Sequence, residues 1–361
     1  MRCSPAEPPH LLPMPFDAIL ISDVCIDEFL RVDDALVMCD LNHKDCKICF
    51  DYAEKIPVSE FRTSLGGNSA NVAAGMAKLG LNVAVYSEIG NDANGNRLFK
   101  ELKERGVDNS LLVRNKGETD IHSIIIYKGE RTILSYHRPK NYQIQNWEEP
   151  KWLYYSSLPK QFEPFQQQLV DYLKEHPKIL TAFNPGVYHF KAGYKAYAPF
   201  LQLTDLLFVN KEEALRILDQ ADGGSEVCPP PNGSLIPPRR HAHSAHGQTI
   251  LPGQTKSKQQ GEWLHKALQK LGPKMTVITN AENGASASNG ANFVESGTVE
   301  IDKPIIDKTG AGDAFASGFL SALIYGKSLD QALRWGLKNS SACIREIGPM
   351  NGLLAKTGID L

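Results

Sequence analysis

The chain has 361 residues, of which 42% are hydrophobic and 22% are charged, a composition typical of a globular protein with a sizeable core. Its 39 Lys and Arg residues nearly balance 41 Asp and Glu residues, so the formal net charge is -2. This balance disfavours nucleic acid and anionic membranes as partners, because neither would meet an attractive field. No apolar run approaches the length of a membrane span.

The N-terminus is rich in proline and lacks the apolar segment of a secretory signal, so a cytoplasmic location is expected. The seven cysteines are an odd number in a mid-sized chain without secretory context. In a reducing compartment, no disulfide is needed to explain them.

Short apolar runs alternate with helical patterns along most of the chain. Residues 18–21 are typical of a buried strand, and a small-residue helix over 68–79 ends at Gly80. The pattern continues with a strand at 83–86, a helix at 93–104 and four further apolar runs at 152–156, 179–183, 206–209 and 275–279. Strands separated by helices predict an α/β fold with a mostly parallel sheet covered by helices on both faces.

Two kinds of segment interrupt this alternation. The stretches 27–37, 55–63 and 121–136 are polar-alternating or β-branched, which predicts a small antiparallel sheet outside the main one. Residues 221–259 are rich in proline and glycine with almost no apolar periodicity, and residues 1–15 are rich in proline. We therefore expect a disordered insertion and a disordered N-terminus around one domain over 16–361.

The segment Asp307-Lys308-Thr309-Gly310-Ala311-Gly312-Asp313 carries the strongest chemical signal. A strand-like stretch over 299–306 precedes it, and a helix from about 311 to 325 is expected to follow. Glycines at a strand–helix junction expose backbone N–H groups at the positive end of the helix, which prepares an anion site. Asp313 inside this cradle is either a base acting beside a bound phosphate or a residue that caps the helix.

In this motif and in two others, the chain resembles the ribokinase-like, or PfkB, family of carbohydrate and nucleoside kinases. The family's carboxyl-terminal Gly-Ala-Gly-Asp motif is matched at 310–313, and its di-glycine motif is matched at 66–73. Its Asn-x-x-Glu signature is matched at 210–213, in the same order along the chain. The resemblance spans about 18–353 and implies a three-layer fold with a β-sheet lid, the lid strands lying within about 27–63 and 121–136.

The resemblance implies an ATP-dependent kinase that phosphorylates a primary hydroxyl of a small carbohydrate. Asp313 matches the family's catalytic base, and Gly310, Ala311 and Gly312 match its anion hole. Preorganised donors of this kind usually supply the larger share of the barrier reduction in phosphoryl transfer.

The nucleotide side follows from the same resemblance. Asn210 and Glu213 match residues that position the Mg²⁺ of ATP through water. The adenine-side motif keeps only its two ends in this chain, Thr279 and Gly284. Asp307 and Thr309 match positions that in many relatives bind a monovalent cation such as K⁺.

For the acceptor, Asp27 matches the family's first-strand aspartate, and Gly67, Asn68 and Asn71 match the polar side of the sugar pocket. Carboxylate and amide groups suit a polyhydroxylated ligand, because they form directed hydrogen bonds to vicinal hydroxyls. The alternative is an ordinary helix N-terminus, with Asn68 as its cap and Asn71 on its surface. The family's usual glycine is replaced by Ser22, which leaves both Asp23 and Asp27 as candidates for the aspartate.

Two other functions remain open at this stage. A nucleoside kinase of the same family would need an aromatic wall for the base, which Tyr136, His137 and Tyr142 could supply. A catalytically silent sugar-binding relative is disfavoured, because it needs neither a base nor a metal-positioning pair. Relatives sometimes pair through exposed lid strands, so a homodimer through the lid is a further expectation.

One cluster lies outside the family pattern. Cys39, His43, Cys46 and Cys49 have a spacing that could close a tetrahedral zinc site, the alternative being turn cysteines beside a solvated histidine. A second His-rich tract, with His241, His243 and His246, lies in the expected insertion. A flexible tract of this kind seldom holds a fixed metal geometry.

Overall fold

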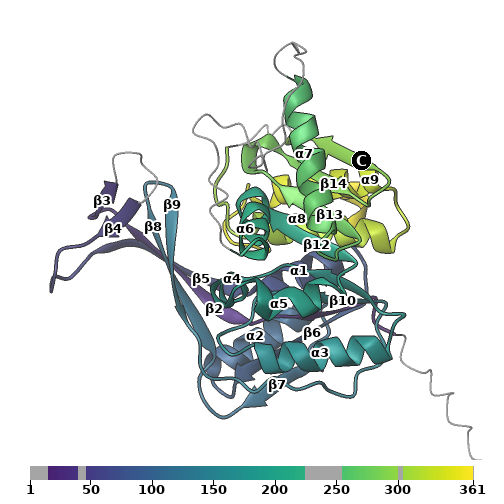
Figure 1. Cartoon of the computed structure of the whole chain (residues 1–361). Helices are drawn as coiled ribbons and strands as arrows, with labels where there is room; N and C mark the ends of the chain where they lie inside the picture. The colour runs from purple at the N-terminus through teal and green to yellow at the C-terminus, as the bar shows by residue number, and fades with distance from the viewer. Residues whose placement is uncertain (1–14, 40–45, 224–253, 300–303, 361) are drawn as a thin grey trace, which may run out of the picture.

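The structure is a computed structural model, and it describes residues 15–39, 46–223, 254–299 and 304–360. Its centre is a nine-stranded sheet in the order β15-β14-β13-β12-β11-β10-β1-β6-β7 (Figure 1). These strands are β1 (Ala18–Ile21), β6 (Val83–Gly90), β7 (Leu112–Asn115), β10 (Trp152–Tyr155), β11 (Leu180–Phe183), β12 (Leu206–Asn210), β13 (Met275–Thr279), β14 (Ala285–Ser288) and β15 (Phe293–Ser296). The expected α/β class with a mostly parallel sheet is confirmed.

Strand pairing divides the sheet into two parts. The seven strands from β13 to β7 pair in parallel, whereas β14 and β15 add an antiparallel edge. Parallel strands all end at one edge of the sheet, so loops distant in sequence meet there. Chain segments after β1, β12 and β13 therefore lie at the same edge.

Helices cover both faces of the sheet and give the domain two hydrophobic cores. Along β1, Ala18 and Leu20 face one core while Ile19 and Ile21 face the other, because side chains alternate along a strand. The first core is formed with α1 (Asn68–Lys78), α2 (Ala93–Glu104), α8 (Ala311–Ile324), α9 (Leu329–Cys343) and α10 (Lys356–Ile359). The second is formed with α3 (Glu163–Glu175), α4 (Val187–Ala192), α5 (Tyr194–Leu201), α6 (Lys211–Ala221) and α7 (Gln254–Gln269).

A separate four-stranded sheet forms the lid, which extends from the main body at the left of Figure 1. Its order is β5-β2-β8-β9, from strands β2 (Cys25–Val32), β5 (Val58–Gly66), β8 (Asp120–Tyr127) and β9 (Glu130–Tyr136), and a hairpin of β3 (Leu36–Cys39) and β4 (Cys46–Cys49) projects beyond it. The lid is confirmed, but the expectation of a wholly antiparallel sheet is wrong. β2 and β8 pair in parallel, because the chain crosses the main sheet between them.

Two sequence expectations about local structure need correction. No strand occurs in the described part of 299–306; instead the backbone N–H groups of Ile306 and Asp307 donate to the carbonyl of Ile344. The expected insertion at 221–259 is shorter, because α6 runs to Ala221 and α7 begins at Gln254. The rest of that insertion, and nearly all of the expected disordered terminus at 1–15, lie outside the described residues.

Within the described ranges, no helix combines the length and apolar character needed to cross a membrane.

Candidate active site

Helices α1 and α8 lie against each other and bring the two glycine motifs together. A Cβ atom added to Gly75 of α1 would lie 2.2 Å from Oγ of Ser317 on α8, a distance that side-chain atoms cannot adopt. The absence of a side chain at Gly75 therefore permits this close helix packing. It brings the start of α1, with Asn68 and Asn71, beside the start of α8, with Asp313.

Asp313 is held by both asparagines of α1. Asn68 Nδ2 donates to Oδ1 of Asp313 at 3.1 Å, and Asn71 Nδ2 donates to Oδ2 at 2.8 Å. The N-cap position of α8 is Gly310, which offers no capping side chain, and the N-cap of α1 is Gly67. Asn71 is buried, at 5% exposure, so it does not lie on the helix surface as the alternative interpretation required. The two asparagines and the aspartate form one hydrogen-bonded group.

This setting makes Asp313 a weaker acid than an ordinary aspartate. Burial raises its pKa to about 7, although the hydrogen bonds from Asn71 and Asn68 act in the opposite direction. Nearby Asp27 raises the pKa further, and Arg131 of the lid lowers it. A carboxylate with a pKa near neutrality is suited to accept a proton, because general-base efficiency is highest when the pKa is close to the working pH.

The turn before α8 is the one expected to form the anion cradle. Gly310 adopts φ 76°, in the left-handed region, and a Cβ there would lie 2.3 Å from Cβ of Pro349. Glycine is therefore required at this position on two independent grounds. A Cβ at Gly312 would meet nothing within 4 Å, so open space adjoins the first turn of α8. Backbone N–H groups at this helix start favour a negatively charged group.

Asp27 lies against the di-glycine motif. A Cβ added to Gly66 would lie 2.3 to 2.4 Å from the carboxylate atoms of Asp27, so the carboxylate occupies the place a side chain would take. Asp27 is also close enough to Asp313 to raise its pKa. Asp23 is buried as well, at 3% exposure, but its carboxylate faces His137 at 3.6 Å. Of the two candidates, Asp27 is the one that adjoins both glycine motifs.

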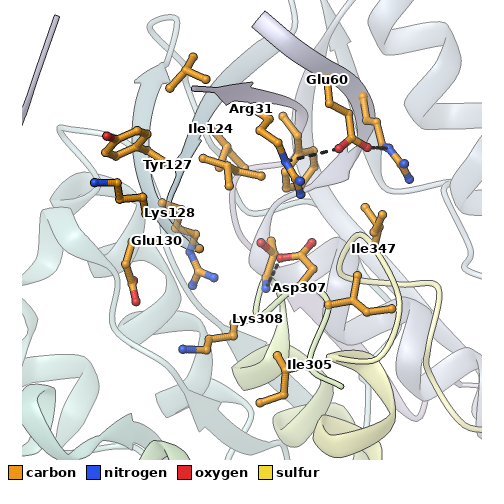
Figure 2. A pocket seen from close by; sticks show the side chains of 18 of the residues that line it. Arg31, Glu60, Ile124, Tyr127, Lys128, Glu130, Ile305, Asp307, Lys308 and Ile347 are labelled. Carbon is orange, nitrogen blue, oxygen red and sulfur yellow. Dashed lines mark hydrogen bonds and ion pairs between the residues drawn. The ribbon is translucent and has the colours of Figure 1, made fainter. Parts of the chain in front are cut away.

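A cleft of about 1060 Å³ separates the lid from the segment that leads into Gly310 (Figure 2). Its lid side includes Arg31 and Lys128, and its opposite side is formed by the 305–309 segment with Lys308. Arg31 forms an ion pair with Glu60 at 3.4 Å, and Glu60 also pairs with Arg62 at 2.5 Å. The lining also carries Asp33, Glu130 and Asp307, so its charges are mixed, and the cationic side chains on both walls are the ones that could contact an anionic ligand.

The Asn-x-x-Glu signature forms a capping box at the start of α6. The backbone N–H of Glu213 donates to Oδ1 of Asn210 at 2.8 Å, and the N–H of Asn210 donates to Oε2 of Glu213 at 2.8 Å. This structural use engages one polar atom of each side chain, which leaves Asn210 Nδ2 and Glu213 Oε1 for other contacts. Burial raises the pKa of Glu213. The pair thus retains polar groups that fit a hydrated Mg²⁺.

The two residues expected on the adenine side, Thr279 and Gly284, lie at either end of the connection from β13 to β14. Thr279 ends β13 and is aligned with Asn210 on β12. Gly284 adopts φ 84°, and a Cβ there would lie 2.0 Å from the carbonyl oxygen of Ser296. The structure therefore gives Gly284 a conformational reason to be glycine, independent of any nucleotide.

Asp307 ties together two turns near the anion cradle. Its Oδ1 accepts from the backbone N–H of Thr309 at 2.8 Å, and its Oδ2 accepts from that of Gly348 at 2.9 Å. The carboxylate thereby joins the 307–309 segment to the turn that follows α9. A carboxylate between two turns with nearby carbonyl groups is compatible with a monovalent cation, and its binding stays a prediction.

The zinc hypothesis for the cysteine cluster and the expectation of no disulfide both need correction. Cys39 and Cys46 face each other across the β3–β4 hairpin, with Cα atoms 4.0 Å apart, and form a disulfide. Disulfide sulfurs are not thiolate ligands, so the four-ligand zinc site is not formed in this state. Cys49 is free, and His43 lies outside the described residues.

The aromatic wall suggested for a nucleoside base is not assembled from the three expected residues. Tyr142 is 6% exposed and packs in the core beside Tyr86 and Phe165. Tyr136 is 51% exposed on the lid, whereas the ring of His137 packs against His122 and Tyr188. These side chains therefore belong to three different environments.

Sequence reasoning missed a group of polar residues beneath the lid, including Asp120, His122 and Lys140. Lys140 Nζ lies 2.7 Å from Oδ2 of Asp120, with both side chains almost fully buried. The signal available in the sequence was the placement of polar residues within otherwise apolar strand patterns at 120–127 and just after 136. The pairing of β2 with β8 places His122 opposite Asp27 and Asp120 two residues away.

Comparison with known proteins adds the family. The model of the pfkB family carbohydrate kinases matches residues 30–356. An ATP-dependent 6-phosphofructokinase from Thermoanaerobacterium thermosaccharolyticum is 26% identical over 317 residues, covering 83% of this chain and 85% of that protein.

Solved structures show the same fold at lower identity. A nucleoside kinase from Methanocaldococcus jannaschii superposes with a TM-score of 0.69 at 18% identity, covering 96% of this chain and 97% of that one. The Arabidopsis thaliana ribokinase complexed with ribose and ATP gives 0.68 at 16% identity, covering 96% and 98%.

The fold and the family match define the class of protein: a ribokinase-like phosphotransferase that acts on a hydroxyl group. The chain belongs to the pfkB family of carbohydrate kinases.

Proposed function

We propose that this protein transfers the γ-phosphoryl group of ATP to a primary hydroxyl of a small carbohydrate, with Asp313 as general base. The observation that carries the proposal is the pair of hydrogen bonds from Asn68 and Asn71 to the two oxygens of Asp313. They fix the carboxylate beside the anion cradle and within electrostatic range of Asp27.

In the proposed reaction, Asp313 takes the proton of the acceptor hydroxyl as that oxygen attacks the γ-phosphorus. The bond between this phosphorus and the leaving oxygen of ADP breaks, and the products are ADP and the sugar phosphate. Backbone N–H groups of Gly310, Ala311 and Gly312 are the proposed donors to the transferring phosphoryl oxygens, and that of Ala311 would first leave its 3.3 Å hydrogen bond to the carbonyl of Lys308. Such donors stabilise charge that develops in the transition state.

Charges around the cleft support this assignment. Lys308 lies two residues before Gly310 and lines the cleft. Arg131, on the opposite lid wall, acts electrostatically on Asp313. Mg²⁺ bound with ATP supplies further charge neutralisation, and Asn210 and Glu213 are the residues that would hold it through water. Thr279 and Gly284 would then adjoin the adenine.

On the acceptor side, Asp27, Asn71 and Asn68 provide directional groups for sugar hydroxyls, and Gly67 lets the backbone approach the ligand. Oδ1 of Asn71 is buried without a hydrogen-bond partner in the structure. A buried acceptor without a partner is costly, so a ligand hydroxyl that donates to it would be favoured. We rank a nucleoside acceptor second, because Tyr142 is committed to the core and cannot stack on a base.

The test uses Asp313→Asn with a panel of hexoses, pentoses, sugar acids, sugar phosphates and nucleosides. Product is detected as a phosphorylated acceptor together with ADP, so that simple ATP hydrolysis is not counted. The wild-type protein should phosphorylate at least one carbohydrate, and the variant should lose at least about 100-fold in kcat while ATP affinity changes little. A variant that keeps more than half of the wild-type kcat would remove Asp313 from the reaction.

A further inference from the structure

We propose that Asp23, His122 and His137 form a binding site for one divalent transition-metal ion of the zinc type, next to Asp27. The three residues come from different parts of the chain: Asp23 follows β1, His122 lies in β8 and His137 follows β9. One ligand atom from each lies within 4.8 Å of the other two. An ion held there would tie the base of the lid to the main sheet.

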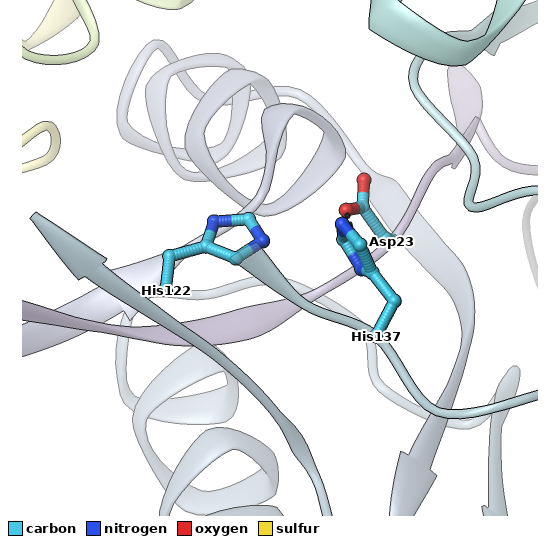
Figure 3. Close-up of side chains that lie close together, drawn as sticks. All are labelled: Asp23, His122 and His137. Atoms are coloured by element: carbon cyan, nitrogen blue, oxygen red, sulfur yellow. Dashed lines mark ion pairs between the residues drawn. The ribbon is translucent and has the colours of Figure 1, made fainter. Parts of the chain in front are cut away.

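The side chains face one another, as Figure 3 shows. The rings of His122 and His137 are nearly perpendicular, with centroids 5.1 Å apart. Oδ1 of Asp23 and Nε2 of His122 are buried without a hydrogen-bond partner in the structure. Buried polar atoms without partners are rare because they cost free energy, so these two atoms point to a missing ligand.

Neighbouring carboxylates orient both imidazole rings for metal binding. Oδ2 of Asp120 lies 3.0 Å from Nδ1 of His137, and Oδ1 of Asp27 lies 3.4 Å from Nδ1 of His122. For His122, an N–H donated from Nδ1 to Asp27 leaves the lone pair on Nε2, the buried atom without a partner. Nδ1 of His137 also lies 3.6 Å from Oδ2 of Asp23, so the tautomer of this ring decides which nitrogen ligates the metal. This carboxylate–histidine arrangement is the usual outer sphere of a histidine metal ligand.

The charges of the cluster also favour a divalent cation. Lys140 balances Asp120 through the 2.7 Å ion pair, and Arg138 faces Glu88 at 3.8 Å. Among the described residues, the ion-pair partners of Asp23 and Asp27 are the two histidines, which carry no charge when they ligate a metal. Lys140 also acts electrostatically on Asp23 and offsets part of this charge, and the remaining negative charge of the two buried carboxylates favours a bound cation.

The donor set selects the metal. Two imidazoles and a carboxylate suit Zn²⁺ and its neighbours in the first transition series, whereas Mg²⁺ prefers oxygen ligands. Tetrahedral coordination places ligand atoms about 3.3 Å apart. Side-chain rotations that move the ligand atoms by about 1 Å would bring the three atoms into this geometry. Cys25 Sγ lies 3.4 Å from Nδ1 of His122, on the other side of the ring, and is not assigned as a ligand.

The experiment measures metal binding without turnover, so its result does not depend on the proposed kinase reaction. The full chain is stripped with a chelator and titrated with Co²⁺, which reports its coordination in the visible spectrum, and with Zn²⁺ by calorimetry. The three histidines at 241, 243 and 246 are replaced by Asn in the reference protein, so that this tract cannot supply the signal. His176→Asn is the matched control, because His176 also faces a carboxylate, Glu149, at 3.7 Å outside the cluster.

The expected result is one ion per chain, with spectra of nitrogen and oxygen ligands. His122→Asn and His137→Asn should each lower the affinity at least about 100-fold, and His176→Asn should leave it unchanged. The site would be overturned if replacing the histidines at 241, 243 and 246 abolished metal binding. It would also be overturned if His122→Asn and His137→Asn bound the metal as tightly as the reference protein does. A cobalt–thiolate charge-transfer band would overturn this ligand set in favour of a cysteine ligand, either Cys25 or one of the cysteines at 39–49.

Misfolding of a cluster variant is controlled by two measurements. Asp23→Asn keeps the shape of the side chain, and its thermal transition without metal shows whether it folds. Zn²⁺ should raise the Tm of the reference protein and raise it less in Asp23→Asn. X-ray absorption of the cobalt-loaded reference protein needs no substitution in the cluster. Two imidazole ligands are expected, and a spectrum without imidazole would contradict the proposal.

Discussion

Asn71 Nδ2 lies 2.8 Å from Oδ2 of Asp313, a hydrogen bond between residues 242 positions apart in the chain. It joins the di-glycine motif to the Gly-Ala-Gly-Asp motif through the packed helices α1 and α8. Because Asn71 donates its N–H group, it favours the charged form of Asp313, and burial of the same carboxylate opposes this. The properties of the candidate base therefore depend on a residue of the acceptor motif.

Changing Asn71 should shift the pH dependence of the reaction. With Asp313 as base and its pKa near 7, kcat/KM of the wild-type protein should rise with pH through about 7 and level off above it. Asn71→Asp places a second carboxylate beside the first, and like charges at this distance raise the apparent pKa of the pair. The rising limb should move to higher pH by at least about one unit.

The control for this shift is Asn292→Asp, an exposed position in the turn between β14 and β15. It adds the same charge to the protein without touching Asp313. Equal pH profiles for Asn71→Asp and the wild-type protein would show that Asp313 does not govern the rate.

Replacing Asp313 should make the protein more stable at high pH. Its folded-state pKa of about 7 lies above the ordinary aspartate value of 3.8, so the folded state retains a proton that the unfolded state releases. The free energy of unfolding therefore falls as the pH rises from about 4 to about 7, and above that range it stays lower by the full amount. Asp313→Asn removes the charge, so its Tm relative to wild type should increase between pH 5 and pH 8.

Comparing the Tm difference at pH 5 with the Tm difference at pH 8 cancels the effects of packing changes, because those effects do not depend on pH. Glu295→Gln removes an exposed charge on β15 and should show no such difference. If the Tm difference between Asp313→Asn and wild type is the same at both pH values, then ionisation of the buried carboxylate does not lower the stability of the fold.

Glu213→Gln separates the structural and metal-related roles of the Asn-x-x-Glu signature. Gln can replace Glu in a capping box, because its side-chain oxygen still accepts from the N–H of residue 210. Stability should therefore change little, whereas the lost charge should raise the Mg²⁺ concentration needed for half-maximal activity. A kcat deficit of about 10-fold to 100-fold, partly recovered at high Mg²⁺, is expected for a group acting through water.

Glu212→Gln is the matched control, since Glu212 is the exposed neighbour outside the capping box. Its Mg²⁺ titration should coincide with that of the wild-type protein. An unshifted midpoint with normal kcat in Glu213→Gln would remove Glu213 from the metal site.

Gly66→Ala should damage acceptor binding more than ATP binding. The added Cβ would lie 2.3 Å from the Asp27 carboxylate, so the carboxylate must move away from the glycine motif. If Asp27 contacts the acceptor, KM for the acceptor should rise at least about 10-fold, because a displaced carboxylate leaves ligand hydroxyls unpaired. Gly297→Ala, with nothing within 4 Å of its added Cβ, is the control. If the acceptor KM is the same in both variants, Asp27 does not contribute to acceptor binding.

The sequence by itself determined the fold class and the location of the main motifs. Alternating apolar runs set the order of strands and helices, because burial on both sheet faces needs continuous apolar strands. The glycines at 66–67 and 310–312 identified the two turns, since only certain residues allow such backbone geometry. These signals are local in the chain, so they can be recognised without knowing which segments meet.

Tertiary structure decided the features that depend on contacts between distant segments. It alone assigned Asp27 to the glycine motifs, moved Tyr142 into the core and assembled Asp23, His122 and His137 beneath the lid. The parallel pairing of β2 with β8 has no local signature, because strand partners are set by long-range packing and not by either strand's own residues. The raised pKa of Asp313 likewise comes from burial between elements far apart in sequence.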